Sequence, residues 1–226
     1  MRAVVLAGGP GTRLLPYTAV LPKPLVPIGD TPILQHILDR LADHGVTEVD
    51  VCLGHLGELI QAYFDRGRNV PPGLRLRWHR EPEPMGTAGA VRGVPDLPST
   101  FVVMNGDVLT SLDVGALMAH HLECEAALTI AVQRHRTEVG LGVVDVADDD
   151  VTGYSEKPVI EHDVSLGVYV FDARALDLMP GIPCQVPELV NALLDAGERV
   201  AAFRSDAEWH DVGTQTGLQA ARAPHA

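Results

Sequence analysis

A glycine-rich loop near the N-terminus constrains the fold more than any other feature of the sequence. The apolar run Ala3–Leu6 reads as a buried strand, and Gly8, Gly9 and Gly11 follow it. Three glycines in four positions allow a tight turn and let backbone N–H groups approach an anion without interference from Cβ atoms. Arg13 and Lys23 add two positive charges nearby. The sequence therefore predicts a phosphate-binding cradle at the carboxyl end of a strand in an α/β domain.

Two common glycine-rich motifs do not account for this loop. Gly9-Pro-Gly11 is followed by Thr12-Arg13-Leu14, so the third glycine of a dinucleotide-binding fingerprint is missing. The chain also has no Gly-x-x-x-x-Gly-Lys-Ser/Thr sequence, which a P-loop requires. The dehydrogenase and P-loop NTPase interpretations therefore lose their main support.

Alternating apolar segments predict a mostly parallel sheet with helices on both faces. The first helix should cover 32–44, with Thr31 as its N-cap and Gly45 closing it. A strand-rich second half should form a small β-rich lobe. The other predicted strands are 46–53, 74–78, 101–104, 127–132, 139–146, 151–155, 166–171 and 200–204, and the other predicted helices are 58–64 (ending at Gly67), one from about 87, 173–179, 186–194 and a short one after 214.

Composition narrows the range of partners. The formal net charge of −13 argues against a nucleic-acid polymer, because nonspecific binding to nucleic acid needs a basic face. No stretch has the length of a membrane span, and three widely spaced cysteines without a Cys-x-x-Cys fit a reduced cytoplasmic setting. We therefore expect a cytoplasmic protein that binds neither membrane nor nucleic acid.

The two lysines stand out among the 17 basic residues, because every other one is arginine. Lys23 and Lys157 each precede a proline. A compact ammonium group suits point contact with a phosphate where a wide guanidinium does not fit. We therefore interpret both lysines as phosphate ligands.

Two aspartates are the candidate metal ligands. Asp107 follows the predicted strand 101–104, and Asp211 follows another strand-like segment near the C-terminus. Mg²⁺ prefers one or two carboxylates, with water and substrate phosphates completing its shell. Together with the loop and the lysines, these carboxylates predict a Mg²⁺ site.

These residues together resemble the sugar-1-phosphate nucleotidylyltransferases, also called nucleotide-sugar pyrophosphorylases, and are closest in motif to the mannose-1-phosphate guanylyltransferases. The resemblance implies a single Rossmann-like nucleotidyltransferase domain over 1–226, with 1–125 mainly binding nucleotide and 126–226 mainly binding sugar phosphate. It also implies that the C-terminal left-handed β-helix of longer relatives is absent. The matching stretches, in the family's order, are Leu6–Leu14, Pro22–Leu25, Glu83–Gly89, Asn105–Asp107, Glu156–Pro158, Gly167–Tyr169 and Trp209–Thr214.

By position, the resemblance also assigns roles to individual residues. Arg13, Lys23, Asp107 and Lys157 would be catalytic, with Asp107 and Asp211 holding Mg²⁺. The nucleotide would contact Leu6, Gly8, Gly9, Gly11, Thr12, Arg13, Glu81, Gly86 and Thr87. The sugar phosphate would contact Asn105, Gly142, Glu156, Lys157 and Gly167.

The implied reaction is NTP plus sugar 1-phosphate giving NDP-sugar plus pyrophosphate. Met85-Gly-Thr-Ala-Gly89 is similar to the Leu-Gly-Thr-Ala-Gly of guanylyltransferases, which favours GTP with mannose 1-phosphate or a manno-heptose 1-phosphate. Thymidylyl, uridylyl, cytidylyl or adenylyl transfer to another sugar phosphate stays open. So do a catalytically silent nucleotide-sugar-binding regulator and a transferase that releases NDP. The oligomeric state is left as monomer or homodimer.

Overall fold

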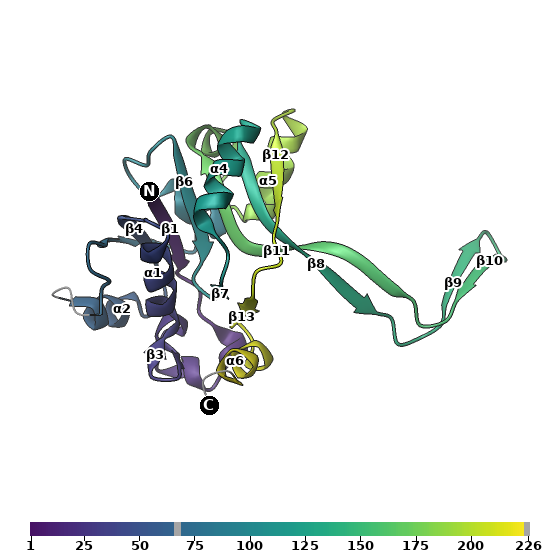
Figure 1. The fold of residues 1–226 in the computed structure, drawn as a ribbon, viewed down its shortest axis with the longest axis horizontal. Helices are drawn as coiled ribbons and strands as arrows, with labels where there is room; N and C mark the ends of the chain where they lie inside the picture. The colour runs from purple at the N-terminus through teal and green to yellow at the C-terminus, as the bar shows by residue number, and fades with distance from the viewer. Residues whose placement is uncertain (66–68, 224–226) are drawn as a thin grey trace.

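The computed structural model describes residues 1–65 and 69–223 and has a seven-stranded central sheet (Figure 1). Its strand order is β12-β8-β11-β6-β1-β4-β5. The strands of this sheet are β1 Arg2–Ala7, β4 Glu48–Leu53, β5 Arg75–Arg80, β6 Thr100–Asn105, β8 Leu128–Glu138, β11 Val159–Asp172 and β12 Val200–Arg204. The helices are α1 Ile33–Asp43, α2 Gly57–Phe64, α3 Thr87–Arg92, α4 Val114–Cys124, α5 Val186–Asp195 and α6 Gln215–Arg222, with short 3₁₀ turns η1 Thr12–Leu14, η2 Tyr17–Ala19, η3 Lys23–Leu25 and η5 Ala173–Leu178.

The predicted mixed, mainly parallel sheet is confirmed. Strand β1 pairs in parallel with β4 and β6, β4 with β5, and β8 with β12, whereas β11 runs antiparallel to both of its neighbours. Alternate residues of β1 face opposite layers: Val5 belongs to the core cluster that includes residues of α1, α2, α4 and α6, and Val4 belongs to the cluster that includes residues of α3, η5 and α5. Helices therefore bury both faces, and the carboxyl ends of β1, β4 and β6 are left to carry loops.

The start of α1 differs from the prediction. Pro32 occupies the N-cap position, and no side chain caps the helix. Thr31 instead belongs to the two-residue strand β3 Thr31–Pro32, which pairs with β2 Pro27–Ile28. The prediction of Thr31 as N-cap is therefore wrong, because its backbone is committed to this small ladder. Gly45 does follow the helix, in the left-handed conformation expected there, and the predicted end of the second helix at Gly67 lies outside the described residues.

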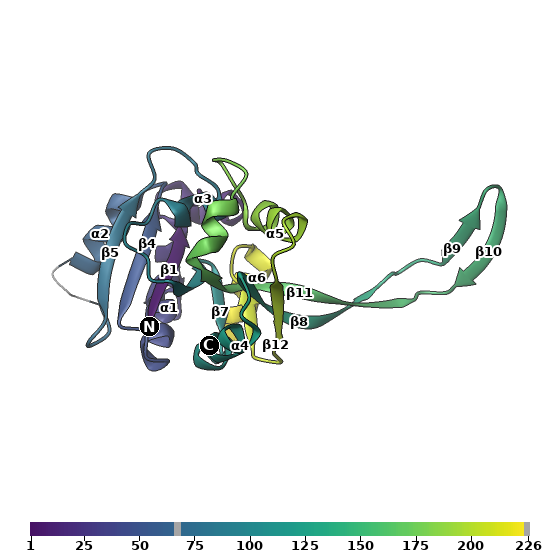
Figure 2. The same cartoon turned by 90° about the horizontal axis from the view of Figure 1, so that it is seen from above.

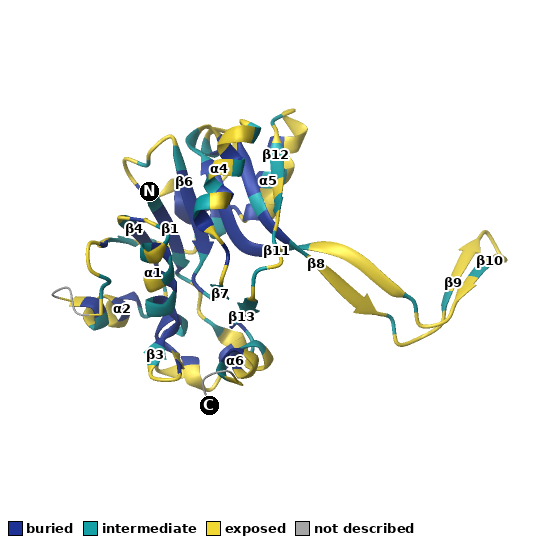
Figure 3. Cartoon of the chain, viewed as in Figure 1, coloured by how far each residue is buried: buried dark blue, intermediate teal, exposed yellow. Residues whose placement is uncertain are grey.

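The strand-rich second half forms a projecting ribbon. Strands β8 and β11 are longer than predicted, and beyond the central sheet they continue as a two-stranded arm that ends in β9 Val143–Ala147 and β10 Asp150–Ser155 (Figures 1 and 2). Most of this arm is exposed, in contrast to the buried part of the same strands inside the sheet (Figure 3). The predicted strands are therefore present, but in this structure they extend away from the domain.

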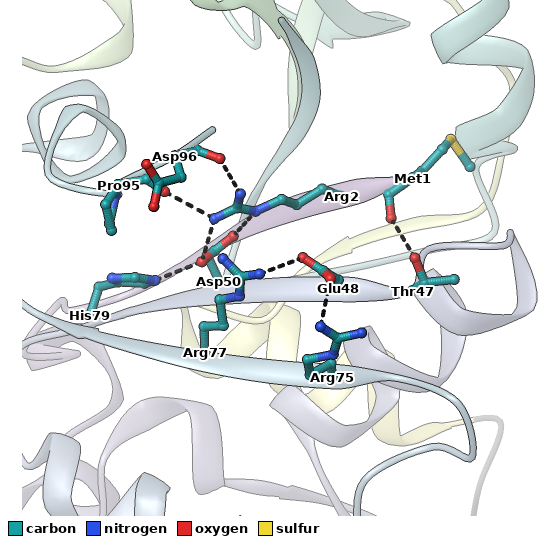
Figure 4. A network of polar contacts seen from close by, with 10 residues as sticks. All are labelled: Met1, Arg2, Thr47, Glu48, Asp50, Arg75, Arg77, His79, Pro95 and Asp96. Atoms are coloured by element: carbon teal, nitrogen blue, oxygen red, sulfur yellow. Dashed lines mark hydrogen bonds and ion pairs between the residues drawn. The ribbon is translucent and has the colours of Figure 1, made fainter. Parts of the chain in front are cut away.

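A polar network ties the neighbouring strands β1, β4 and β5 together (Figure 4). The Arg2 guanidinium contacts both carboxylate oxygens of Asp50, at 2.5 and 3.0 Å, and His79 approaches the same carboxylate at 2.6 Å. The Asp50 side chain is fully buried. This charge is tolerated because it is paired on two sides.

Candidate active site

A pocket of about 690 Å³ opens at the carboxyl ends of β1, β4 and β6. This is the edge of an open α/β sheet at which ligands bind. Strand β6 lies beside β1, and the Gly106 N–H donates to the Leu6 carbonyl at 2.9 Å, so the loops after both strands meet. The pocket brings together ten of the predicted residues: Leu6, Gly8, Gly9, Arg13, Lys23, Glu81, Gly86, Thr87, Asn105 and Asp107.

The glycine loop is closely packed at two points. A Cβ at Gly8 would lie 2.1 Å from a carboxylate oxygen of Glu81. Gly11 has a positive φ of 63° and begins η1, and a Cβ there would lie 3.0 Å from the Cβ of Lys23. Gly11 and Thr12 do not line the pocket themselves. They form the turn that places Arg13 on its wall and Lys23 beside it.

Lys23, Asp107 and Asp211 converge beside Gly213. The Lys23 ammonium forms an ion pair with Asp107 Oδ2. A Cβ built on Gly213 would lie 2.7 Å from Asp211 Oδ1, 2.8 Å from Lys23 Nζ and 2.9 Å from Asp107 Oδ2, so all three polar atoms surround one point. The sequence-based pairing of these two aspartates is therefore reproduced, although more than 100 residues separate them.

A short antiparallel ladder produces this convergence. Strand β13 Trp209–Asp211 pairs with β7 Val108–Thr110, with Asp211 opposite Val108. The Val212 N–H donates to the Asp107 carbonyl at 2.9 Å. The Asp211 carboxylate is then oriented by a hydrogen bond of 2.8 Å that it accepts from the Gly213 N–H.

Gly167 supports the same edge from β11. Its φ is 70°, and a Cβ there would lie 2.7 Å from the side-chain nitrogen of Asn105. Asn105 lines the pocket and Gly167 does not. Of these two predicted sugar-site residues, Asn105 is therefore on the wall, and Gly167 lies directly behind it.

The far end of the pocket is formed by the loop before α3. Gly86 has a φ of 79°, and a Cβ there would collide with the Cys184 carbonyl oxygen at 2.3 Å. The Thr87 N–H and hydroxyl both donate to the Gln185 side chain, at 3.2 and 3.1 Å. Burial raises the pKa of the Glu81 carboxyl, while the hydrogen bond that it accepts from the Met85 N–H lowers it.

The remaining predicted sugar-site residues lie on the ribbon, where β8 and β11 pass into β9 and β10. Gly142, Glu156 and Lys157 are exposed and do not line the pocket. Gly142 and Glu156 are nevertheless brought together there: a Cβ on Gly142 would lie 3.2 Å from Glu156 Oε2, which also accepts a hydrogen bond from the Tyr154 hydroxyl at 3.1 Å. The structure therefore places the predicted site residues in two separate groups.

Four residues of the site were not singled out from the sequence. Gly54 and His55 follow β4, and their position after a strand adjacent to β1 could have suggested them. Gly213 lay inside the recognised Trp209–Thr214 stretch, but nothing there indicated how close three charged groups approach it. Gln185 comes from a distant loop, and no sequence pattern pointed to it.

The donor set suits Mg²⁺. Asp107 lines the pocket, and Asp211 does not line it but lies close to Asp107 beside Gly213, so two carboxylates stand together and substrate phosphates could supply further oxygens. Within residues 1–65 and 69–223, no group of three or more His, Cys, Asp and Glu side chains could hold a metal ion. Two carboxylates are compatible with a cation whose other ligands are water and phosphate oxygens.

Comparison with known proteins identifies similar chains. The profile of the Nucleotidyl transferase family matches residues 2–224. The chain is 32% identical to a UTP–glucose-1-phosphate uridylyltransferase of Synechocystis and 33% identical to a mannose-1-phosphate guanylyltransferase of Mycobacterium tuberculosis, covering 94% of this chain and 60% and 61% of theirs. The crystal structure of HddC from Yersinia pseudotuberculosis superposes with a TM-score of 0.78 at 25% identity, covering 100% of this chain and 99% of HddC.

The chain spans about 60% of the length of the curated relatives it matches. In the part of the chain that the structure describes, each helix is too short or too polar to cross a membrane.

Proposed function

Because the chain belongs to the nucleotidyl transferase family, we propose that it transfers a nucleoside monophosphate from an NTP to a sugar 1-phosphate, giving NDP-sugar and pyrophosphate. The convergence of Lys23, Asp107 and Asp211 on one point beside a glycine-rich phosphate loop is the observation that carries this proposal. Such an arrangement suits phosphoryl chemistry, which needs alignment and charge neutralisation more than a protein nucleophile.

Each part of the pocket has a task in this reaction. Backbone N–H groups of Gly8 and Gly9 would hold the triphosphate, with Arg13 facing its β- and γ-phosphates. Lys23 would stabilise charge on the α-phosphate as the sugar-phosphate oxygen attacks in line and pyrophosphate leaves. Asp107 and Asp211 would hold Mg²⁺, which when bound neutralises charge on the phosphate oxygens.

We favour GTP as the nucleotide. Glu81 lines the pocket, and one of its carboxylate oxygens already accepts the Met85 N–H. Its remaining acceptor capacity suits the adjacent N–H donors on the Watson–Crick edge of guanine, whereas uracil offers one such donor. The Met85–Gly89 motif and the guanylyltransferase among the relatives support the same choice.

Mannose 1-phosphate or a manno-heptose 1-phosphate is the favoured acceptor, because the Met85–Gly89 motif is similar to that of the mannose-1-phosphate guanylyltransferases. Lys157 would hold the sugar phosphate, while Glu156, Gly142 and Gly167 would line the sugar site. We place this activity in the cytoplasm, which the free cysteines Cys52, Cys124 and Cys184 support, since a reduced compartment keeps thiols unpaired.

Pyrophosphate release with Mg²⁺ tests the proposal, using ATP, GTP, CTP, UTP and dTTP against a panel of hexose and heptose 1-phosphates. The expected result is release with GTP and a manno-configured sugar phosphate. Pyrophosphate release with another NTP and sugar phosphate would overturn the proposed substrate specificity but would support the proposed type of reaction.

Two variants and one negative result complete this test. Lys23→Ala and Asp107→Ala should each lower turnover more than tenfold with an unchanged far-ultraviolet circular dichroism spectrum, and wild-type rates in both would contradict the site assignment. Nucleotide binding without release from any pair would favour a regulator that binds without catalysis.

A further inference from the structure

Gln185 enters the pocket from the second half of the chain and is held there by backbone hydrogen bonds. The N–H groups of Ala88 and Gly89 donate to the Cys184 carbonyl at 3.0 and 3.1 Å. In return, the Cys184 N–H donates to the Met85 carbonyl at 2.9 Å, and the Cys184 side chain is buried. Because Cys184 is fixed on both sides, the next residue, Gln185, has a defined place at the start of α3.

The side-chain oxygen of Gln185 is occupied by three donors. It accepts the Thr87 N–H at 3.2 Å and the Thr87 hydroxyl at 3.1 Å, and as the N-cap of α5 it also accepts the Glu188 N–H. Two of these donors are backbone N–H groups, which can only donate. The amide must therefore present its oxygen to them and its NH2 group on the opposite side.

The NH2 group of Gln185 is left for a ligand. Gln185 lines the pocket and is exposed. Within residues 1–65 and 69–223, no group accepts a hydrogen bond from its side-chain nitrogen. A pocket wall that carries an oriented N–H donor is suited to an acceptor atom of the bound molecule.

Thr87 cannot provide this donor itself. Its N–H and its hydroxyl both donate to Gln185, and the hydroxyl oxygen accepts the Val186 N–H at 2.9 Å. Thr87 was predicted from the sequence to contact the nucleotide, but both of its donors are engaged. The donor that this end of the pocket offers is therefore on Gln185.

Glu81 supplies the opposite character at the same end. It also lines the pocket, and it is bonded to Met85, two residues before Thr87 on the same loop. An ionised carboxylate only accepts hydrogen bonds, whereas the Gln185 NH2 group only donates them. Guanine carries a keto oxygen at O6 beside two N–H donors, while adenine carries an amino group at the corresponding position. An acceptor and a donor together therefore match guanine and mismatch adenine.

We propose that Gln185 is a specificity-determining residue, whose side-chain N–H donates to the O6 keto oxygen of guanine while its side-chain oxygen holds Thr87 and caps α5. This inference rests on the proposed function and adds which atom of the base is read. It also gives the second half of the chain a part in choosing the nucleotide.

Gln185→Glu tests the proposal, because it keeps an oxygen for Thr87 and Glu188 and replaces the NH2 group by an acceptor. The assay compares kcat/KM for GTP and for 2,6-diaminopurine riboside triphosphate, which has an amino group in place of the keto oxygen. The wild type should favour GTP, and Gln185→Glu should reduce that preference about 10- to 100-fold, the value of one hydrogen bond made or left unpaired. The added negative charge weakens binding of both nucleotides alike, so it cancels in the ratio.

Two comparisons separate base reading from a purely structural cap. Gln185→Glu should leave the preference for GTP over ITP unchanged, because these nucleotides differ only in the 2-amino group. Glu188→Gln keeps an acceptor for the Gln185 N–H and lies outside the pocket, so it should keep the wild-type preference for GTP over the diaminopurine nucleotide. An unchanged preference in Gln185→Glu, or an equal change in Glu188→Gln, would overturn the proposal.

Equilibrium binding keeps this inference separate from the proposed function. Dissociation constants of GTP and the diaminopurine nucleotide are measured by calorimetry without a sugar phosphate, so no turnover is required. If Gln185→Glu narrows their ratio although no substrate pair releases pyrophosphate, the base reading is supported and the proposed reaction is rejected. If pyrophosphate is released but the wild type binds both nucleotides equally well, the reaction is supported and the role of Gln185 is overturned.

Discussion

Gly213 offers the sharpest test of the site geometry, because it is the point around which Lys23, Asp107 and Asp211 gather. The change Gly213→Ala places a methyl group 2.7 to 2.9 Å from one polar atom of each residue. Carbon atoms do not normally approach such atoms within about 3.2 Å, so all three polar atoms, or the Gly213 backbone, must move by several tenths of an ångström. No positive φ is found at Gly213, so the alanine backbone itself is tolerated.

The expected magnitude follows from that displacement. A misplacement of about 1 Å in a reacting constellation can cost about 100-fold in rate, so a shift of several tenths should cost about 10- to 100-fold in kcat. This corresponds to about 1.4 to 2.7 kcal/mol of lost transition-state stabilisation. Folding should survive, because the methyl group disturbs only polar interactions close to Gly213. The melting temperature should therefore fall by no more than about 4 °C, equivalent to about 1 kcal/mol for a chain of this size.

The assay is steady-state pyrophosphate release at saturating substrates, alongside thermal unfolding. Gly181→Ala is the control, because a Cβ there meets nothing within 4 Å and the residue lies outside the pocket. This control should keep the wild-type kcat. If Gly213→Ala also keeps kcat within twofold, the three converging groups are not part of the reaction, and the geometric reasoning is refuted.

Three further predictions concern stability and pH. Arg2→Ala leaves the buried Asp50 carboxylate with one partner and should cost about 3 kcal/mol, lowering the melting temperature by about 6–12 °C; an unchanged value would contradict the network's role. Burial raises the pKa of the Glu81 carboxyl, so ionising Glu81 lowers the free energy of unfolding as the pH rises above the usual pKa of 4.5. Glu81→Gln should therefore raise the free energy of unfolding in urea at about pH 7 but not at about pH 4. An equal change in this free energy at the two pH values would refute the prediction. Burial lowers the pKa of His121, so the free energy of unfolding of the wild type should fall as the pH drops below 6.5. If the free energy of unfolding of a His121→Gln variant falls with pH just as steeply, His121 is not the cause.

The glycine loop and Asp107 could be predicted because local chemistry decides both. A buried strand followed by several glycines has few alternatives to a tight turn, and a polar residue directly after the neighbouring strand must lie at the same edge. Asp211 ends a short strand of a separate two-stranded ladder, so its position beside Asp107 depends on the pairing of β13 with β7.

Other features depend on tertiary contacts that leave no periodic pattern. Thr31 is a good capping residue by type, but pairing with Ile28 decides its conformation. Gln185 enters the pocket because a distant loop packs against α3, where the Ala88 N–H donates to the Cys184 carbonyl.

The ribbon was the feature least accessible from the sequence. Alternating residues in β8 and β11 predict strands whether or not one face is covered, so the pattern could not separate a compact lobe from an outstretched arm. Its length becomes clear only from the pairing of Glu138 with Val159, which continues the ladder well beyond the sheet.

The fate of the two ends of the triphosphate distinguishes nucleotidyl transfer from other phosphate chemistry. GTP labelled at the α-phosphate and, separately, at the γ-phosphate is incubated with enzyme, Mg²⁺ and the accepted sugar 1-phosphate. Nucleotidyl transfer should place the α-label in the NDP-sugar and the γ-label in pyrophosphate, in equal amounts and only when the sugar phosphate is present. Release of γ-label as inorganic phosphate, or of pyrophosphate without a labelled nucleotide-sugar, would contradict it.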